Sequence, residues 1–544
     1  MQWLKDRPLT LLLLSCIPLF LINLGELAVN IMEARNFITA REMLVDDNWL
    51  LTTINGEPRY QKPPLPTWLT AFSAAAFGFK AWAMRLPAAL SAMMLLTYGF
   101  KLHGDLFKNS RLNFWGGMVL ITSFYIVFSA RNGQWDIFTH AFMMGAIFYI
   151  HKLFTAENKK LHYGLLTGLF LAASWMSKGP VSLYALLLPF LIAYGFTYRY
   201  RWNKSLILPF IVLLTVAVLG SGWWFWYTYT YDGETLRAIT EREATNWTSY
   251  NVRPFYYYWS FFTQSGLWTL LAFVALLFPY LKNRVKDKKG YTFSFLWTIL
   301  SVVLLSIIPE KKSRYLLPVL IPMAWNTAYY LEYLIANFKN IKDWKEKLPV
   351  YLHFGILATV GTVFFAGGYF FLKDNLEGIN WIWFILLAIC LLIIGVLLWK
   401  SLLKKEVARM LQLSVLLIMV VTTFGLPLSG ALSDNKEYKP LSELNNWEAE
   451  NPFPVYEYDF FTPELIWDYQ GVIPVIKNEG EFNWPQESTY GVLVAEDHLE
   501  DFKKDFEGYE LKAVESYDMN PKGKPDRSHK TRLARTLYLV RKLP

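Results

Sequence analysis

Long apolar segments alternate with short polar segments over most of the chain. Apolar runs of roughly 18 to 25 residues recur from Leu9 onward, and each is long enough to cross a hydrocarbon core of about 30 Å as a helix. We count about thirteen of these runs. The pattern predicts an all-α polytopic membrane protein with about thirteen transmembrane helices.

The pattern changes near Asp434, where charged residues become dense and no apolar run is long enough to span a membrane. Four segments alternate apolar and polar residues as strands do, and one has helical periodicity. The expected strands are 454–459, 490–497, 509–517 and 535–542, and the expected helix is 496–506. We therefore divide the chain into a transmembrane domain, 1–433, and a soluble C-terminal α/β domain, 434–544.

Basic residues gather in alternate loops between the apolar runs. They lie near residues 5–7, 101–111, 152–160, 199–204, 282–289, 339–347 and 400–409. The positive-inside rule places these loops and the N-terminus in the cytoplasm, so the C-terminal domain is expected on the outer, periplasmic side. Topology thus explains the net charge of +9, and we expect no nucleic-acid partner.

The first apolar run, about residues 9–29, follows Lys5 and Arg7 as in a secretory signal. It is too long for the apolar core of a signal peptide, and no small-x-small cleavage site ends it. We expect it to stay in the membrane as an anchor. The composition agrees, because 54% of the residues are hydrophobic, more than a soluble chain of this size needs to form its core.

Two polar segments on the predicted outer side are long enough to hold a site, namely 30–80 and 231–258. Within the first, residues 34–44 have helical periodicity and are expected to lie along the membrane surface. A second, partly apolar helix is expected to begin at Pro63 and Pro64.

The outer segments are rich in basic residues, which such loops usually lack. These residues are Arg35, Arg41, Arg59, Lys62, Arg85, Arg131, Arg253, Lys311, Lys312 and Arg314. A phosphate ligand would explain them, because guanidinium and ammonium groups match phosphate oxygens in charge and hydrogen-bond geometry. Binding of lipid headgroups, or pairing with loop carboxylates, explains them equally well.

Two carboxylates lie at the outer membrane boundary, Glu33 and Asp136. Either could act as a general base toward an acceptor hydroxyl. From the residues alone we favour the alternative that Glu33 pairs with Arg35, and Asp136 with Arg131. Lys178 precedes a Gly-Pro break between two apolar runs and is expected to snorkel outward.

No metal-binding spacing is found in the sequence. The two cysteines lie inside apolar runs, and the seven histidines are scattered. We expect no tightly bound metal or cofactor, and a divalent cation is not indicated.

Several motifs together resemble a known family. They are EARNFITAREML, NGEPRYQKPPLPTWL and AMRLPAAL in the first outer segment, followed by ARNGQWDIF, WMSKGPVSL, RPFYYYW and KKSRYLLPVLIP. As a set they are similar to the membrane-embedded GT-C glycosyltransferases of the protein O-mannosyltransferase group, glycosyltransferase family 39. The similarity is greatest to the bacterial branch, the lipid A aminoarabinose transferases.

The resemblance implies a GT-C fold and an inverting glycosyltransferase of the plasma membrane, which in a bacterium is the inner membrane. Such an enzyme moves a sugar from a polyprenyl-phosphate donor to an acceptor hydroxyl on lipid A, a glycan or a protein at the outer face. The expected partners are therefore the polyprenyl-phosphate-linked sugar, the acceptor and membrane lipids.

The resemblance also implies roles for individual residues. The catalytic carboxylates are expected to be Glu33 and Asp136. The donor phosphate is expected to meet Arg35, Lys62, Arg253, Lys311, Arg314 and Tyr315, and further substrate contacts are expected from Arg41, Arg59, Tyr60 and Gln61.

Three positions depart from the family pattern. Met32 stands where the family commonly has the favoured catalytic aspartate, directly before Glu33. Gln61 stands where the aminoarabinose transferases have a glutamate, and the histidine expected within 231–258 is absent. The metal contact known in that branch is therefore not expected, and a different sugar or acceptor fits as well.

Two other classes of function compete with the enzyme. A transporter or flippase of a lipid-linked substrate would favour internal repeats and ionisable residues near the bilayer midplane, whereas here no repeat is found and the charges lie at one face. A scaffold that only presents the C-terminal domain would leave the outer cations and Glu33 unexplained.

Overall fold

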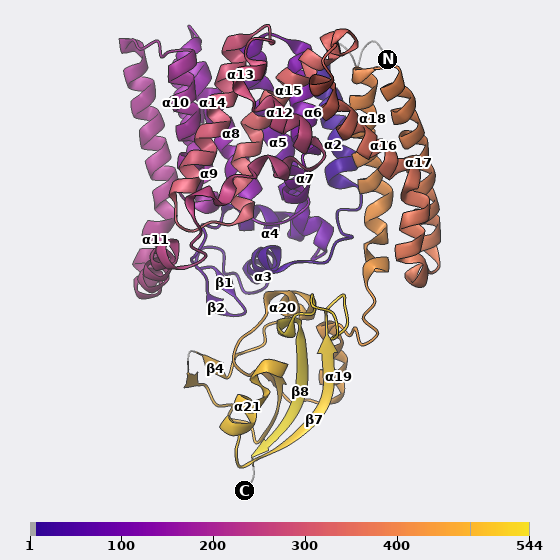
Figure 1. The fold of residues 1–544 in the computed structure, drawn as a ribbon. Coiled ribbons are helices and arrows are strands. Elements are labelled where there is room, and N and C mark those ends of the chain that lie inside the picture. Colours follow the sequence, from indigo (N-terminus) through magenta and orange to yellow (C-terminus); the bar gives the residue numbers. More distant parts are fainter. Residues whose placement is uncertain (1–6, 479, 543–544) are drawn as a thin grey trace.

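The computed structural model describes residues 7–478 and 480–542, and most of them form a bundle of helices (Figure 1). Lys5, of the first basic segment, lies outside this range. The helices of the bundle are α2 (Pro8–Cys16), α5 (Ala81–Phe107), α6 (Ser110–Thr122), α7 (Phe124–Ala130), α8 (Asp136–Thr155), α9 (Lys160–Lys178), α10 (Leu188–Thr197), α11 (Ile207–Ser249), α12 (Thr269–Ala275), α13 (Phe278–Leu281), α14 (Lys288–Ile307), α15 (Leu317–Asn337), α16 (Trp344–Leu372), α17 (Ile379–Leu403) and α18 (Val407–Val420).

Within the described residues, seven helices are long and apolar enough to cross a membrane. The number is eight if α6 and α7, which meet at a bend of 64°, form one broken span. The chain is therefore a multi-pass helical membrane protein, as predicted. The predicted number of about thirteen spans is higher, because other apolar runs form shorter or less apolar helices, such as Leu183–Thr197.

The first polar segment holds two helices where the sequence predicts them, α3 (Ile31–Val45) and α4 (Leu65–Phe77). A short hairpin, β1 (Thr53–Ile54) and β2 (Glu57–Pro58), lies between them. A capping box begins α3: Asn30 accepts a hydrogen bond from the Met32 amide, and Glu33 accepts one from the Asn30 amide.

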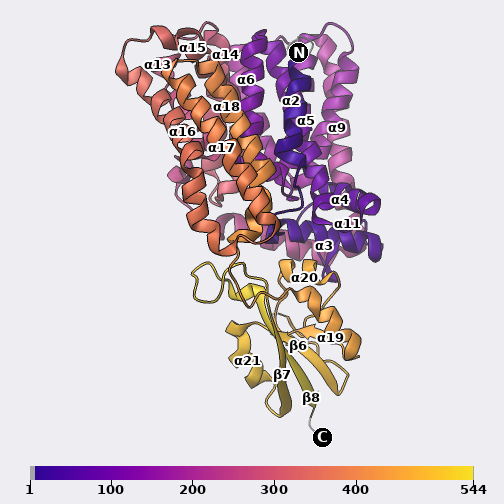
Figure 2. The same cartoon turned by 90° about the vertical axis from the view of Figure 1, so that its right-hand side faces the viewer.

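Helix α3 runs across the ends of the bundle helices and is not a free surface helix (Figures 1 and 2). Its middle is buried all round, from Asn36 to Met43. The sequence led us to expect a helix that lies along the membrane surface with one side in water. The helix is buried instead, because the C-terminal region covers the side that would otherwise face water.

The C-terminal region is a four-stranded sheet with helices, as the sequence predicts. The strands are β3 (Val455–Glu457), β6 (Thr489–Val494), β7 (Tyr509–Asp518) and β8 (Ala534–Lys542), and the main helices are α19 (Leu444–Glu450), α20 (Pro463–Tyr469) and α21 (Leu499–Asp505). The strand order is β3-β6-β8-β7; β3 and β6 are parallel and the other pairs antiparallel. A separate hairpin joins β4 (Lys477–Asn478) to β5 (Glu481–Phe482).

Arg41 and Asn55 fasten this region to the first polar segment. The Arg41 guanidinium donates to the carbonyls of Ile466 (3.3 Å) and Gly471 (2.7 Å). Asn55 exchanges two hydrogen bonds with the backbone of Ile473, at 2.7 and 2.9 Å. The predicted role of Arg41 in substrate contact therefore has a structural alternative, because its side chain is buried in this junction.

The first polar segment and the C-terminal region lie at the same end of the bundle (Figure 1). Helix α13, and hence the basic run that follows it, lies at the opposite end. The charge pattern predicts this same two-sided arrangement. Which side faces the cytoplasm is a separate matter and stays a prediction.

Candidate active site

A buried ion pair joins Asp136 to Lys178. Asp136 is the first residue of α8, and Lys178 is the last residue of α9, so the antiparallel helices bring them together. The pair suits both helix dipoles, because the carboxylate lies at a helix N-terminus and the ammonium at a C-terminus. Asp136 is 2% exposed. The expected partner, Arg131, instead donates to the carbonyls of Leu19 and Asn23.

Lys178 therefore points inward, against the expectation that it snorkels outward. Its ammonium also lies 4.9 Å from the centre of the Tyr315 ring. Gly179, at φ +69°, ends α9 directly after it and turns the chain. A lysine at the edge of an apolar run is the signal that could have marked it as a functional residue.

Tyr315 and Arg314 line the other side of this pair. The Tyr315 hydroxyl donates to Glu310 (3.1 Å), and burial, with Glu310 next, raises the pKa of Tyr315, so the phenol stays protonated. The Nε atom of Arg314 is buried and has no hydrogen-bond partner in the described residues. A buried donor without an acceptor is costly and suits a site that takes an anion.

The first polar segment contributes further cations. Lys62 pairs with Glu243 of α11 at 3.3 Å, and the two side chains are 29% and 37% exposed. Arg59 lies 4.8 Å from the Trp135 ring centre and donates to Thr39 (3.1 Å). Trp135 directly precedes Asp136, so Arg59 contacts the residue next to the buried pair in the chain.

The cations around this site act on one another. Burial, and next the charge of Arg35, lower the pKa of Arg59. Partial burial, and next the charge of Arg314, lower the pKa of Arg35. Guanidinium groups keep their proton in proteins. The lowered pKa values therefore reflect buried guanidinium groups with a like charge nearby, a setting that a bound anion would stabilise.

Two further predicted residues lie beside Lys62. The Tyr60 hydroxyl donates to Asp232 (2.7 Å) at the kink of α11, where Asp232 leaves helical geometry. The side-chain oxygen of Gln61 is buried without a hydrogen-bond partner among the residues described. Tyr60 therefore fixes the kink of α11, and Gln61 retains an unused acceptor.

The Lys311 side chain binds backbone carbonyl groups. Its ammonium donates to the carbonyls of Arg253 (2.9 Å), Ile308 (2.6 Å) and Pro309 (3.4 Å). It thereby holds the segments around Arg253 and Pro309 together, and little of it is left for a phosphate because it is 3% exposed. The Arg253 residue is exposed and its backbone joins the same junction.

Glu33 forms a buried pair with Arg85, not with the expected Arg35. Arg85 donates to both carboxylate oxygens, at 2.9 and 2.8 Å. The same carboxylate accepts from the Asn30 amide and side chain and from the Gly133 amide. The side chains of Glu33 and Arg85 are each 1% exposed. Because both oxygens of Glu33 already accept several hydrogen bonds, neither is left for an acceptor hydroxyl.

The C-terminal region packs against the side of α3 that faces away from the bundle (Figure 1). Its Glu464 accepts two hydrogen bonds from Arg532, both 2.7 Å, and both charges act on Arg35. In the described part of the chain no group of three or more histidine, cysteine or carboxylate side chains is arranged to hold a metal ion.

Residues 61–226 match the dolichyl-phosphate-mannose-protein mannosyltransferase family. The predicted family resemblance is confirmed. The part of the chain that matches this mannosyltransferase family contains Lys62, Asp136 and Lys178, so it carries both the first-segment lysine and the buried ion pair.

Curated relatives are named as undecaprenyl phosphate-α-4-amino-4-deoxy-L-arabinose arabinosyl transferases. The protein of Shewanella sediminis is 27% identical over 352 residues, which are 60% of this chain and 60% of that protein. The first such protein of Proteus mirabilis is 23% identical over 345 residues, 61% of this chain and 60% of its own length. The similarity thus spans about 60% of these relatives.

The solved structure of ArnT from Cupriavidus metallidurans in the apo state has the same fold. The TM-score is 0.67 at 15% identity, over 99% of this chain and 98% of that one. The structure of ArnT bound to undecaprenyl phosphate gives 0.66 at 14% identity, over 98% and 97%. The shared fold includes the C-terminal region as well as the bundle.

Proposed function

We propose that this protein is an inverting glycosyltransferase that moves a sugar from a polyprenyl-phosphate donor to an acceptor hydroxyl. The observation that carries the proposal is the buried Asp136–Lys178 pair, near which the buried Nε of Arg314 has no hydrogen-bond partner in the part of the chain described. A carboxylate beside several cations suits this reaction, since the acceptor must lose a proton while the departing phosphate gains negative charge.

In the proposed step the acceptor oxygen attacks the anomeric carbon from the face opposite the phosphate. Asp136 takes the hydroxyl proton, the new glycosidic bond forms, and the bond from carbon to phosphate oxygen breaks. The polyprenyl phosphate leaves with the electron pair, and Lys62, Arg314 and Arg35 stabilise its charge. These side chains supply the positive charge themselves, so the proposal includes no resident metal.

Between the two predicted carboxylates, the proposal assigns the base to Asp136. In the described part of the chain, Lys178 is the side chain that hydrogen-bonds the Asp136 carboxylate, and substrate can displace or share it. Both oxygens of Glu33 are already occupied by Arg85 and backbone amides. We therefore propose that Glu33 positions the first polar segment.

The proposal extends to the carrier and the membrane arrangement. The names of the Shewanella and Proteus relatives support undecaprenyl phosphate as the carrier. We further propose about thirteen spans in a bacterial inner membrane, with the remaining helical segments of the bundle crossing alongside the seven or eight long apolar spans. The site and the C-terminal region then face the periplasm, where lipid A, a glycan or a protein supplies the hydroxyl.

The experiment is a transfer assay in proteoliposomes with undecaprenyl-phosphate-linked sugars and extracted acceptors, read by mass spectrometry. Wild-type protein is expected to release undecaprenyl phosphate and to add one sugar increment to an acceptor. Lys62→Ala is expected to abolish this. Lys80→Ala, at an exposed lysine of the same segment, serves as the matched control. Full turnover by Lys62→Ala would overturn the site, and movement of the donor without a new glycosidic bond would indicate a transporter.

A further inference from the structure

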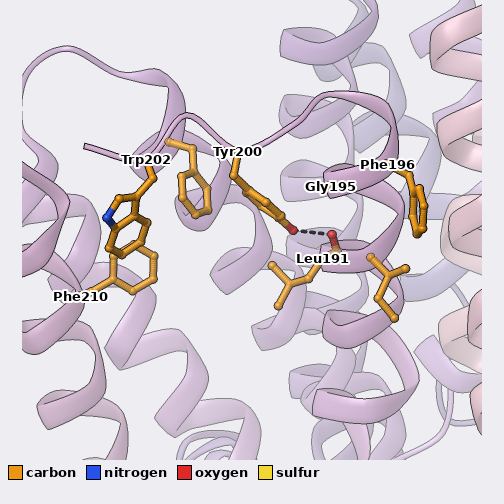
Figure 3. A pocket seen from close by; sticks show the side chains of 8 residues that line it. Leu191, Gly195, Phe196, Tyr200, Trp202 and Phe210 are labelled. Carbon is orange, nitrogen blue, oxygen red and sulfur yellow. Dashed lines mark hydrogen bonds between the residues drawn. The ribbon is translucent and has the colours of Figure 1, made fainter. Parts of the chain in front are cut away.

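An apolar cleft opens at the end of the bundle opposite the proposed active site. It lies where the link from α10 to α11 folds back over the helices, and its volume is about 760 Å³. Its walls include Leu191, Gly195, Phe196, Tyr200, Trp202 and Phe210 (Figure 3). We call it the aromatic cleft.

The aromatic cleft offers almost no hydrogen-bonding groups. The hydroxyl of Tyr200 is already engaged, because it donates to the carbonyl of Leu191 across the cleft (Figure 3). Trp202 lies against Phe210 at 5.2 Å between ring centres. Phe196 and Trp202 are 78% and 62% exposed. Large apolar side chains this open need an apolar cover, which a hydrocarbon chain provides.

The link that forms one wall of the cleft is strongly basic. Arg199, Arg201 and Lys204 are exposed and no carboxylate occurs between Thr197 and Leu206. No ion pair or side-chain hydrogen bond joins any of the three cations to another described residue. Tyr200 and Trp202 alternate with Arg199 and Arg201 along the link. The rings of Tyr200 and Trp202 therefore line the cleft, and the cationic side chains lie next to them in the chain.

We propose that the aromatic cleft binds one anionic phospholipid, with an acyl chain between the rings and the headgroup phosphate on Arg199, Arg201 and Lys204. The charge complementarity favours an anionic over a zwitterionic headgroup. Tyrosine and tryptophan at the cleft mouth occupy the headgroup level, where such rings are enriched in membrane proteins. The ligand is a lipid of the leaflet that faces the basic loops.

This lipid is distinct from the glycosyl donor. The donor phosphate reacts at Lys62 and Arg314, which lie at the other end of the bundle, by the first polar segment (Figure 1). A donor bound there has its phosphate a membrane thickness away from the cations of the cleft. The two sites therefore bind phosphates on opposite membrane faces.

The test is native mass spectrometry of the detergent-solubilised full chain, titrated with phosphatidylglycerol or phosphatidylcholine. Wild-type protein is expected to bind a first phosphatidylglycerol more tightly than phosphatidylcholine. The variant Arg199→Gln/Arg201→Gln/Lys204→Gln is expected to weaken phosphatidylglycerol binding by about 100-fold at low salt, since each of the three cations contributes roughly fivefold. Arg199→Lys/Arg201→Lys/Lys204→Arg keeps the charge and should keep the binding.

A matched control removes three cations of another basic loop at the same end, Lys282→Gln/Lys286→Gln/Lys288→Gln, and should leave the first phosphatidylglycerol site unchanged. Ile192→Trp, which fills the cleft, should weaken both lipids. An equal loss in the matched control would overturn the proposal, because it would indicate general charge attraction. Specific loss of a co-purified polyprenyl phosphate in the cleft variants would also overturn it.

Discussion

The buried pair of Glu33 and Arg85 gives the sharpest test of which carboxylate does chemistry. Arg85 and the Gly133 amide both donate hydrogen bonds to the carboxylate of Glu33. In Glu33→Gln the side-chain NH₂ group would face these donors and could accept none of their hydrogen bonds. Breaking a fully buried pair by changing one partner costs about 3 to 5 kcal/mol of folding free energy. We expect Glu33→Gln to lose that much stability and, with it, most transfer activity.

The double variant Glu33→Gln/Arg85→Met separates a positioning role from a catalytic one. Removing both charges leaves no unpaired ion, and replacing a whole buried pair is often close to neutral. The recovery is expected to be partial, because the carbonyls of Leu24 and Ala28 lose Arg85 as a donor.

The assay is unfolding in a denaturing detergent, followed by tryptophan fluorescence, together with sugar transfer at a temperature where all variants are folded. The double variant should regain more than half of the lost stability and measurable transfer. Activity that stays absent in a double variant of restored stability would refute the positioning role and return Glu33 to the chemistry.

Further predictions concern the site and the junction. Asp136→Asn should lower turnover by about 10²- to 10⁴-fold, as expected for loss of a general base, with donor binding retained in a pull-down of radiolabelled donor; near-normal turnover would contradict the assignment. Lys178→Met should leave Asp136 buried without its cation, and should reduce both turnover and stability, measured in the same assays; unchanged stability would show that the pair does not exist in solution. Burial raises the pKa of Tyr315 above the value of about 10 that tyrosine has in the unfolded chain. The phenol of the folded protein is therefore neutral at every pH below about 10, and it loses its proton only at a pH above the raised pKa. The activity ratio of wild type to Tyr315→Phe should therefore stay constant from about pH 6 to about pH 9, and a ratio that changes steeply in that range would refute this. Arg41→Ala should cost about 1 to 3 kcal/mol at the junction, since two buried carbonyls lose their donor, and limited proteolysis should then cut near α20 sooner than in wild type.

Local patterns in the chain predicted the elements well. Helices α3 and α4, the strands β6 and β8, and the multi-pass bundle all follow from periodicity and hydropathy, which are properties of neighbouring residues. The two-sided distribution of charge likewise predicted that the first polar segment and the C-terminal region share one end. The number of spans was predicted less well. Kinked and shortened helices have the same apolar composition as full spans, so the sequence alone does not separate them.

The sequence by itself determined which side chains are available for chemistry: two outer carboxylates among many cations, beside apolar helices. Only the tertiary structure decided which of them meet. Asp136 pairs with a lysine 42 residues away, Glu33 with an arginine 52 residues away, and Arg41 with a carbonyl 425 residues away. Hydropathy and periodicity act over a few turns, whereas an ion pair depends on how distant helix ends pack. The favoured neighbours, Arg35 and Arg131, were close in sequence but lay on the wrong faces.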